Sequence, residues 1–237
     1  MTQALLQIDD LHTYIGDYHI LQGVNISMHE GGVTALLGRN GAGKTTTLRS
    51  IMGLAPPRGR IRFDGQDIVG LSTAAISRLG IGYVPETLGL FSGLTVAETL
   101  RLAARSGAPD HSRIDWITSL FPALRKFWHS SAGHLSGGQK QMLAIANALV
   151  EPKRLILVDE PTKGLAPSVV AELMAALKQL TQQSTSILLV EQNFHFAAGL
   201  ATETTVLESG QTTWQGSMGD IANDEALRRR LLGVSVI

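Results

Sequence analysis

The sequence predicts an α/β domain built on a parallel sheet, and three observations support this fold class. Short continuous aliphatic runs recur at 33–37, 155–158 and 187–190, as is typical of strands buried on both faces. Helical patterns separate these runs, as in α/β proteins. Hairpin signals near both ends of the chain predict additional antiparallel strands.

In chain order, the strand at 33–37 leads into a glycine-rich loop and a helical run at 45–52. The alternating residues 60–63 precede Asp64 and Gly65, a pair that is typical of a tight hairpin turn. The stretch 95–150 carries helical patterns and no convincing strand, so we expect an inserted helical part there.

The second half of the chain predicts a strand–helix–strand crossover. The strands at 155–158 and 187–190 enclose a segment with one apolar helical face, and a parallel pair needs a connection of this length. That face consists of Val170, Leu173, Met174, Leu177 and Leu180. A last hairpin is expected at 204–214, around Ser209 and Gly210.

Composition excludes several classes of function. The chain has 237 residues, and its 20 basic and 20 acidic side chains cancel, so charge gives no support to nucleic acid as a partner. The absence of cysteine excludes disulfides, thiolate metal sites and cysteine nucleophiles. Only 17% of residues are charged, against about 25% in a typical soluble domain, which suggests that partners cover part of the surface.

No apolar run approaches the roughly 18–20 residues that a membrane-spanning helix needs. Asp9 and Asp10 stand where a signal peptide would require an apolar stretch. We therefore expect a chain that is neither exported by that route nor membrane-spanning.

Residues 38–45, Gly-Arg-Asn-Gly-Ala-Gly-Lys-Thr, match the phosphate-binding P-loop pattern between a strand and a helix. Glycines let the backbone approach phosphate closely, and the N–H groups at a helix N-terminus attract anions. The alternative is a chance glycine-rich turn, which the strand and helix context makes rare. The residues assigned to nucleotide binding on this motif are Gly38, Asn40, Gly41, Gly43, Lys44, Thr45 and Thr46.

Each polar residue of this site has a predicted task. Lys44 would contact the β- and γ-phosphates, Thr45 would ligate Mg²⁺, and Thr46 would donate to the α-phosphate. Asp159 ends the aliphatic strand at 155–158 and is placed to hold Mg²⁺ directly or through water, while Glu160 can face the attacking water. Alone, this acidic pair could be an ordinary strand-to-loop edge.

Residues 135–139, Leu-Ser-Gly-Gly-Gln, resemble the signature of ABC-type ATPases, and they end 20 residues before Asp159. The resemblance extends over nearly the whole chain and is weaker at 105–132. It implies one P-loop ATPase domain with a RecA-like parallel core sheet, a flanking antiparallel β-subdomain and an inserted α-helical subdomain. Residues 1–90 and 151–237 would form the nucleotide-binding core, and 91–150 the helical part.

The same resemblance assigns further residues. Tyr14 looks like the aromatic residue that stacks on adenine, with Tyr18 as a competitor, and it is expected to precede the first core strands. Glu86 stands where most relatives carry glutamine; it would act in catalysis and metal binding and link the site to a permease, unless it is an ordinary loop carboxylate. Gln192 stands where most relatives carry histidine, so it would hydrogen-bond the γ-phosphate or the water while Glu160 serves as the general base.

Two motifs indicate a subfamily. Residues 84–86, Val-Pro-Glu, and 190–193, Val-Glu-Gln-Asn, resemble the second ATPase subunit of branched-chain amino acid importers. Urea and amide importers carry close relatives of this subunit. Other positions depart from the pattern: Asn147 replaces a usual arginine, no basic residues follow Glu86, and Lys163 occupies a position that is commonly acidic or apolar.

The family resemblance also implies partners. Two ATPase subunits, alike or unlike, would enclose two ATP molecules head to tail, with Ser136, Gly137 and Gly138 of one facing the γ-phosphate held by the other. Membrane permease subunits would bind this pair on the cytoplasmic face of the membrane, and a solute-binding protein would take part indirectly. The apolar residues 88–94 would line the groove for a permease helix, or else face the core.

Two other functions remain open from the sequence. One is a soluble ABC ATPase that acts on DNA or ribosomes, although such proteins usually carry coiled-coil insertions or two linked nucleotide domains. The other is a nucleotide-binding regulatory subunit with little hydrolysis, which Glu160 argues against.

Overall fold

A six-stranded sheet forms the centre of the computed structural model, which describes residues 4–105 and 107–233. Its strand order is β10-β9-β3-β8-β7-β6, and every neighbouring pair is parallel except β9 and β10. The predicted strands and the crossover through α7 (Pro167–Gln182) are confirmed. The strands of this sheet are β3 (Val33–Gly38), β6 (Ile81–Val84), β7 (Leu155–Asp159), β8 (Ser186–Val190), β9 (Glu203–Glu208) and β10 (Gln211–Ser217).

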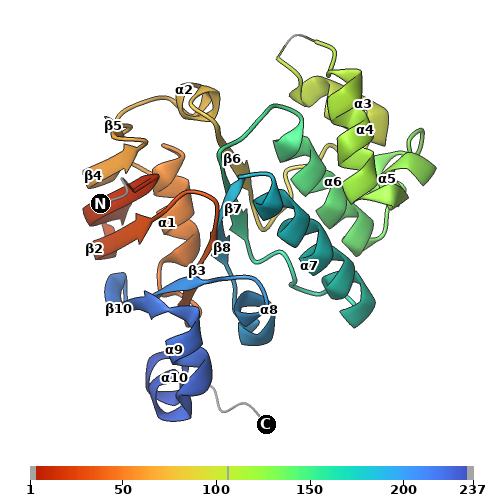
Figure 1. The fold of residues 1–237 in the computed structure, drawn as a ribbon. Helices are drawn as coiled ribbons and strands as arrows, with labels where there is room; N and C mark the ends of the chain where they lie inside the picture. The colour runs from red at the N-terminus through yellow and green to blue at the C-terminus, as the bar shows by residue number, and fades with distance from the viewer. Residues whose placement is uncertain (1–3, 106, 234–237) are drawn as a thin grey trace.

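A second, antiparallel sheet has the order β2-β1-β4-β5. It contains the predicted hairpin of β4 (Pro57–Phe63) and β5 (Gln66–Asp67), together with β1 (Leu6–Ile15) and β2 (Tyr18–Met28). The long β1–β2 hairpin was not predicted. Tyr14 lies inside β1 and, as expected, precedes the strands of the central sheet, the first of which is β3. Helix α1 (Lys44–Ile51) lies between the two sheets (Figure 1).

The central strands divide their side chains between two hydrophobic cores. Alternate residues such as Leu36, Leu157 and Leu188 pack with α1 and the antiparallel sheet. The residues between them, such as Leu37 and Val158, pack with the helices on the other face. Because successive side chains of a strand point to opposite faces, one aliphatic run serves both cores.

A helical group lies beyond β6 in the chain and packs on that second face (Figure 1). It contains α3 (Val96–Ala103), α4 (His111–Leu120), α5 (Pro122–Lys126), a short 3₁₀ turn (Ala132–His134) and α6 (Gly137–Leu149). Thr95 and Ser136 each begin a helix with a reciprocal capping box. The division at residues 90 and 150 remains a prediction.

The remaining helices are α2 (Thr73–Arg78), α8 (Phe194–Ala198), α9 (Met218–Asn223) and α10 (Glu225–Leu232). Of these, α8 and α9 contribute side chains to the core on the second face of the central sheet. Within the described part of the chain, none of the helices has both the length and the apolar composition to cross a bilayer.

The parallel arrangement brings four chain segments to one edge of the sheet. The carboxyl ends of β3, β6, β7 and β8 all face this edge, because these neighbouring strands run in the same direction. The segments that follow them carry the P-loop, Glu86, Asp159 with Glu160, and Glu191 with Gln192. Parallel α/β sheets commonly bind ligands at this edge.

Candidate nucleotide site

The loop between β3 and α1 requires glycine at two positions. Gly38 and Gly43 have φ angles of 150° and 100°, and a Cβ at these positions would lie 2.3 Å from the Leu207 carbonyl oxygen and 2.6 Å from Leu21. Gly41 also has a positive φ, of 80°, but no atom lies within 4 Å of where its Cβ would be. The backbone at Gly41 is therefore open to a ligand.

Lys44 is buried at the start of α1, with 5% of its side chain exposed. Its ammonium group donates to the carbonyl oxygens of Gly38 at 2.9 Å and Arg39 at 3.1 Å. Burial lowers the pKa of Lys44, and the charges of Glu160 and Asp159 oppose that effect. Because α1 has no side-chain N-cap and no acidic residue in its first turn, its N-terminus stays available to an anion.

Thr45 and Asp159 meet across the loop, where the Thr45 hydroxyl donates to Asp159 Oδ1 at 3.1 Å. The other oxygen, Asp159 Oδ2, is buried and has no hydrogen-bond partner among the described residues. Burial raises the pKa of Asp159 to about 6, and the hydrogen bond from Thr45 opposes this. An orphaned carboxylate oxygen next to a hydroxyl suits Mg²⁺, which prefers oxygen ligands and keeps several waters.

Magnesium would not need further protein ligands at this place. No group of three or more histidine, cysteine or acidic side chains is arranged as a metal site in the residues that the structure describes. A magnesium ion bound here through Thr45 and Asp159 would therefore take its other ligands from phosphate oxygens and water.

Glu160 points its carboxylate into the same pocket. Its backbone has a φ of 45°, and its N–H donates to the Val190 carbonyl at 2.9 Å, so the turn directly after β7 is held against β8. Gln192 Nε2 donates to Glu160 Oε1 at 2.6 Å. The side chain of Glu160 is 10% exposed, and the ammonium group of Lys44 lies 3.9 Å from its Oε1.

Glu191 is a site residue to which the sequence analysis assigned no role. It is 2% exposed, and its carboxylate accepts from the backbone N–H groups of Thr162, Gln192 and Asn193, each at 3.0 Å. Burial raises its pKa and these hydrogen bonds oppose the rise. Glu191 thus connects the loop after β7 to the loop after β8. In the sequence, its position directly after an aliphatic strand is the feature that could have identified it.

Glu86 and Lys163 close the open side of the pocket. Lys163 Nζ donates to Glu86 Oε1 at 2.6 Å and lies 3.9 Å from Glu160 Oε2. The hydrogen bond to Glu86 raises the pKa of Lys163. Together with the P-loop, these residues and Gln192 line a cavity of about 370 Å³.

The structure does not bring every predicted residue to this pocket. Ser136 caps α6 and Gly137 is exposed, and neither they nor Gly138 line the cavity of their own chain. Gly138 is buried against α7, where a Cβ would lie 2.5 Å from Val169. Any contact of Ser136 and Gly137 with nucleotide would therefore need a second chain.

Tyr14 does not line the cavity either. Its ring stacks on His19 with centroids 4.2 Å apart, and Arg58 lies 5.1 Å from the ring centre. The preceding residue, Thr13, is fully buried and bonds to Ser50 of α1. Successive side chains of a strand point to opposite faces, so Tyr14 lies on the face of β1 that is turned away from α1. The assignment of Tyr14 to the base remains a prediction.

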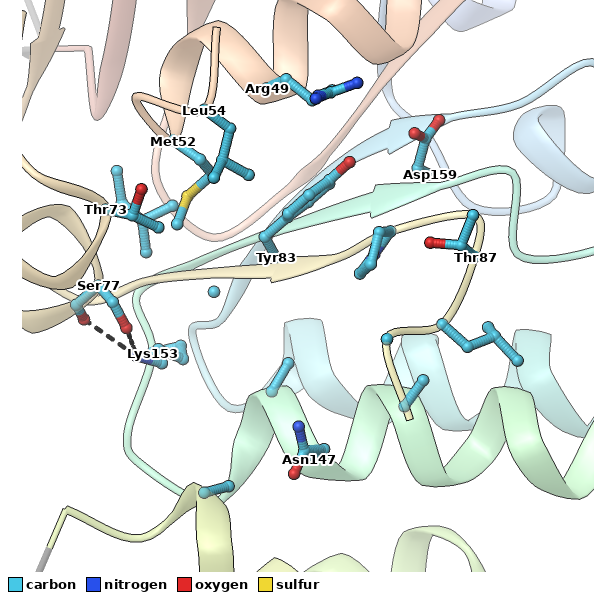
Figure 2. A pocket seen from close by; sticks show the side chains of 18 of the residues that line it. Arg49, Met52, Leu54, Thr73, Ser77, Tyr83, Thr87, Asn147, Lys153 and Asp159 are labelled. Atoms are coloured by element: carbon cyan, nitrogen blue, oxygen red, sulfur yellow. Dashed lines mark hydrogen bonds between the residues drawn. The ribbon is translucent and has the colours of Figure 1, made fainter. Parts of the chain in front are cut away.

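A larger cavity of about 800 Å³ adjoins the site at Thr45 and Asp159, between α1, β6 and the helical group. Figure 2 shows Tyr83 in this cavity with its hydroxyl directed toward Asp159, and Asn147 on the opposite wall. Leu88 and Leu90 pack against the core, whereas Phe91 is 65% exposed. The apolar stretch 88–94 thus faces both the core and solvent.

Comparisons with known proteins agree with this geometry. The family model described as ABC transporter matches residues 21–163. The chain is 35% identical over 232 residues to the high-affinity branched-chain amino acid transport ATP-binding protein BraG of Pseudomonas aeruginosa, covering 97% of this chain and 100% of that protein. It is 36% identical to the probable branched-chain amino acid transport ATP-binding protein LivF of Archaeoglobus fulgidus, covering 97% and 99%.

Among solved structures, one described as the ATP binding subunit of an ABC transporter superposes with a TM-score of 0.81. It is 31% identical in sequence, and the match covers 94% of both chains. The fold of nearly the whole described chain is therefore shared with that structure.

Proposed function

The chain belongs to the ABC transporter family of ATP-binding proteins, and on that premise we propose that it powers the uptake of branched-chain or related amino acids. The observation that carries the proposal is the convergence of Lys44, Thr45, Asp159 and Glu160 on one pocket, although the two halves of this set are 114 residues apart in the chain. The relatives named for branched-chain amino acid transport support the choice of solute.

ATP binding uses positioning and charge, because phosphoryl transfer requires little covalent chemistry from the protein. The β- and γ-phosphates would lie against the N-terminus of α1, and Lys44 would exchange its two backbone carbonyl partners for phosphate oxygens. Thr45 and Asp159 would hold Mg²⁺, which neutralises charge on the phosphates when it is bound.

Hydrolysis transfers the γ-phosphoryl group to water and releases ADP and phosphate. Glu160 would accept the proton from the attacking water, since its carboxylate lies beside Lys44 at the phosphate end of the pocket. The side-chain amide of Gln192 cannot act as a general base near neutral pH. It already donates to Glu160 and would keep that carboxylate oriented.

A second ATPase subunit would complete the site. The exposed N-terminus of α6, with Ser136 and Gly137, would face the γ-phosphate held by the other subunit. The partner is either another copy of this chain or a related subunit.

The large cavity beside Tyr83 would receive a helix of a membrane permease. Leu88 lines this cavity, and the exposed Phe91, three residues further along the chain, offers a further apolar contact. The chain would then lie at the cytoplasmic face of a membrane, and a solute-binding protein on the other side would act through the permease.

The variant Glu160→Gln tests the proposal. It should bind ATP with nearly unchanged affinity and lose turnover by at least about a hundredfold, because the amide cannot take the proton. The measurements are nucleotide binding by calorimetry and phosphate release with and without the permease. Glu172→Gln, a change at an exposed position on α7, serves as the matched control, and hydrolysis by Glu160→Gln near the wild-type rate would refute the assignment.

A further inference from the structure

Lys163 is a cation that the reaction described above does not use. It lies in the loop after β7, and 65% of its side chain is exposed. Its ammonium group contacts two carboxylates of the nucleotide pocket, Glu86 at 2.6 Å and Glu160 at 3.9 Å. Lysine in this position therefore adds a second positive charge to the pocket, next to that of Lys44.

The backbone that carries Lys163 is held firmly. Glu160 N–H donates to Val190, and Thr162 N–H donates to the buried carboxylate of Glu191. These two bonds attach the loop to the end of β8. Because the backbone is restrained and the side chain is exposed, the ammonium group can change partners without a movement of the loop.

The two lysines stand on either side of one carboxylate. Lys44 lies 3.9 Å from Glu160 Oε1, and Lys163 lies 3.9 Å from Glu160 Oε2. Lys44 approaches from the P-loop, which places it at the β- and γ-phosphates. A phosphoryl group next to both Lys44 and Glu160 would be the terminal one, and Lys163 would then lie on the far side of the β-phosphate.

We propose that Lys163 binds the γ-phosphate of ATP from within the same chain, and that Glu86 holds its ammonium group at that place before the nucleotide binds. This inference rests on the function proposed above. It makes Lys163 a residue that distinguishes ATP from ADP, since only ATP carries the phosphate that the lysine reaches.

The ion pair between Lys163 and Glu86 is suited to an exchange in which Lys163 leaves this carboxylate for the γ-phosphate. Both side chains are substantially exposed, at 65% and 39%, and exposed ion pairs contribute little to stability. The γ-phosphate offers more acceptor oxygens and more negative charge than one carboxylate. Lys163 would therefore transfer to the phosphate, and the Glu86 carboxylate would be released.

The test compares the affinities of the non-hydrolysable analogue AMP-PNP and of ADP, both with Mg²⁺, by calorimetry. In Lys163→Met the affinity for AMP-PNP should fall about tenfold while that for ADP stays within about twofold, because one charge-assisted contact to the γ-phosphate is lost. Lys163→Arg should keep most of the preference for AMP-PNP over ADP, because arginine retains the positive charge. Lys178→Met removes an equal charge at an exposed position of α7 and should leave both affinities unchanged.

A second pair of variants separates phosphate binding from simple neutralisation of Glu86. In the Glu86→Gln background, Lys163→Met should again lower the affinity for AMP-PNP about tenfold, because the phosphate contact does not depend on the Glu86 carboxylate. No loss in that background, or an unchanged ratio of AMP-PNP to ADP affinity in Lys163→Met itself, would overturn the proposal. If wild-type protein bound neither nucleotide, the proposed function would fail instead.

Discussion

At the residue scale, the pocket concentrates carboxylates, and burial controls the ionisation of one of them. Asp159 is 1% exposed, and burial raises its pKa to about 6 from an ordinary 3.8. The folded chain therefore holds the Asp159 proton more tightly than the unfolded chain does. The free energy of unfolding falls as pH rises from about 4 to about 6, and this loss persists above pH 6.

Asp159→Asn should therefore stabilise the nucleotide-free protein. At pH 7.5 we expect an increase in the free energy of unfolding of about 1–3 kcal/mol, since the amide carries no charge and can still accept from Thr45. Denaturant-induced unfolding at pH 7.5 and at pH 4 would measure the difference in free energy of unfolding between the variant and the wild type. This difference should be smaller at pH 4. An equal increase in stability at both pH values would contradict the ionisation argument. We also expect Asp159→Asn to lose Mg²⁺-dependent ATP binding.

A second residue-scale prediction concerns the aromatic side chains of the first hairpin. Ile15 returns to the face of β1 that carries the buried Thr13, and its cross-strand partner is Tyr18, which is 77% exposed. Ile20, two residues further along β2, lines the nucleotide pocket. Tyr18 is exposed and close in sequence to a pocket residue, so it competes with Tyr14 for contact with a base.

Tyr18→Ala should weaken ATP binding by about tenfold, the magnitude of one base-stacking contact. Tyr14→Ala should change it by less than about twofold, since the Tyr14 ring is stacked on His19. Fluorescent-nucleotide titration compares the two variants directly, and a larger loss in Tyr14→Ala would reverse the assignment.

At the element scale, the contact between α6 and α7 depends on a glycine of the signature segment. Gly138 packs so closely that a Cβ would lie 2.5 Å from Val169 Cγ1, whereas a Cβ at Gly137 would find Leu165 at 3.9 Å, an ordinary contact. The two neighbouring glycines therefore serve different purposes: Gly138 allows helix packing, and Gly137 keeps the exposed N-terminus of α6 clear.

Gly138→Ala should destabilise the protein by about 1–3 kcal/mol through overpacking. Gly137→Ala should leave the free energy of unfolding within about 0.5 kcal/mol, as expected for a surface change. The double variant Gly138→Ala with Val169→Ala should recover part of the loss. Thermal or denaturant unfolding measures all three, and equal effects of the two single variants would contradict the packing argument.

At the scale of the whole molecule, the P-loop pocket and the predicted nucleotide contact at the start of α6 do not meet within one chain. The P-loop pocket contains Lys44 and Glu160, while Ser136 and Gly137 lie exposed at the start of α6, outside that pocket. A head-to-tail pair of chains would bring each α6 N-terminus to the phosphates of the other chain.

ATP should therefore drive association when hydrolysis is blocked. We expect Glu160→Gln to sediment as a dimer with ATP and as a monomer with ADP, because only ATP offers a γ-phosphate to the second chain. If the functional dimer consists of this chain and a different ATPase subunit, the dimer will form only when that related subunit is added. Full-rate hydrolysis at concentrations where the wild type is strictly monomeric would contradict this expectation.

Much of the fold and the phosphate site could be predicted from the sequence, because they depend on local pattern. An aliphatic run identifies a buried strand, and a P-loop between strand and helix identifies an anion site. Glu160 could be proposed as the catalytic carboxylate because it directly follows such a strand. Terminal charges are harder to interpret from pattern. Arg228 belongs to a run of three arginines, yet it is buried and donates to the carbonyls of Ile221 and Ala222.

Other features depend on which segments become neighbours, and only the folded chain decides that. Glu86 and Lys163 are 77 residues apart, and they meet because β6 and β7 are adjacent in the sheet. Glu191 becomes a structural tie because β7 and β8 end side by side. The side of the strand on which Tyr14 lies follows from the packing of Thr13 on α1. Local residue patterns do not encode these distances, since they arise from strand order and from side chains that satisfy one another across the sheet.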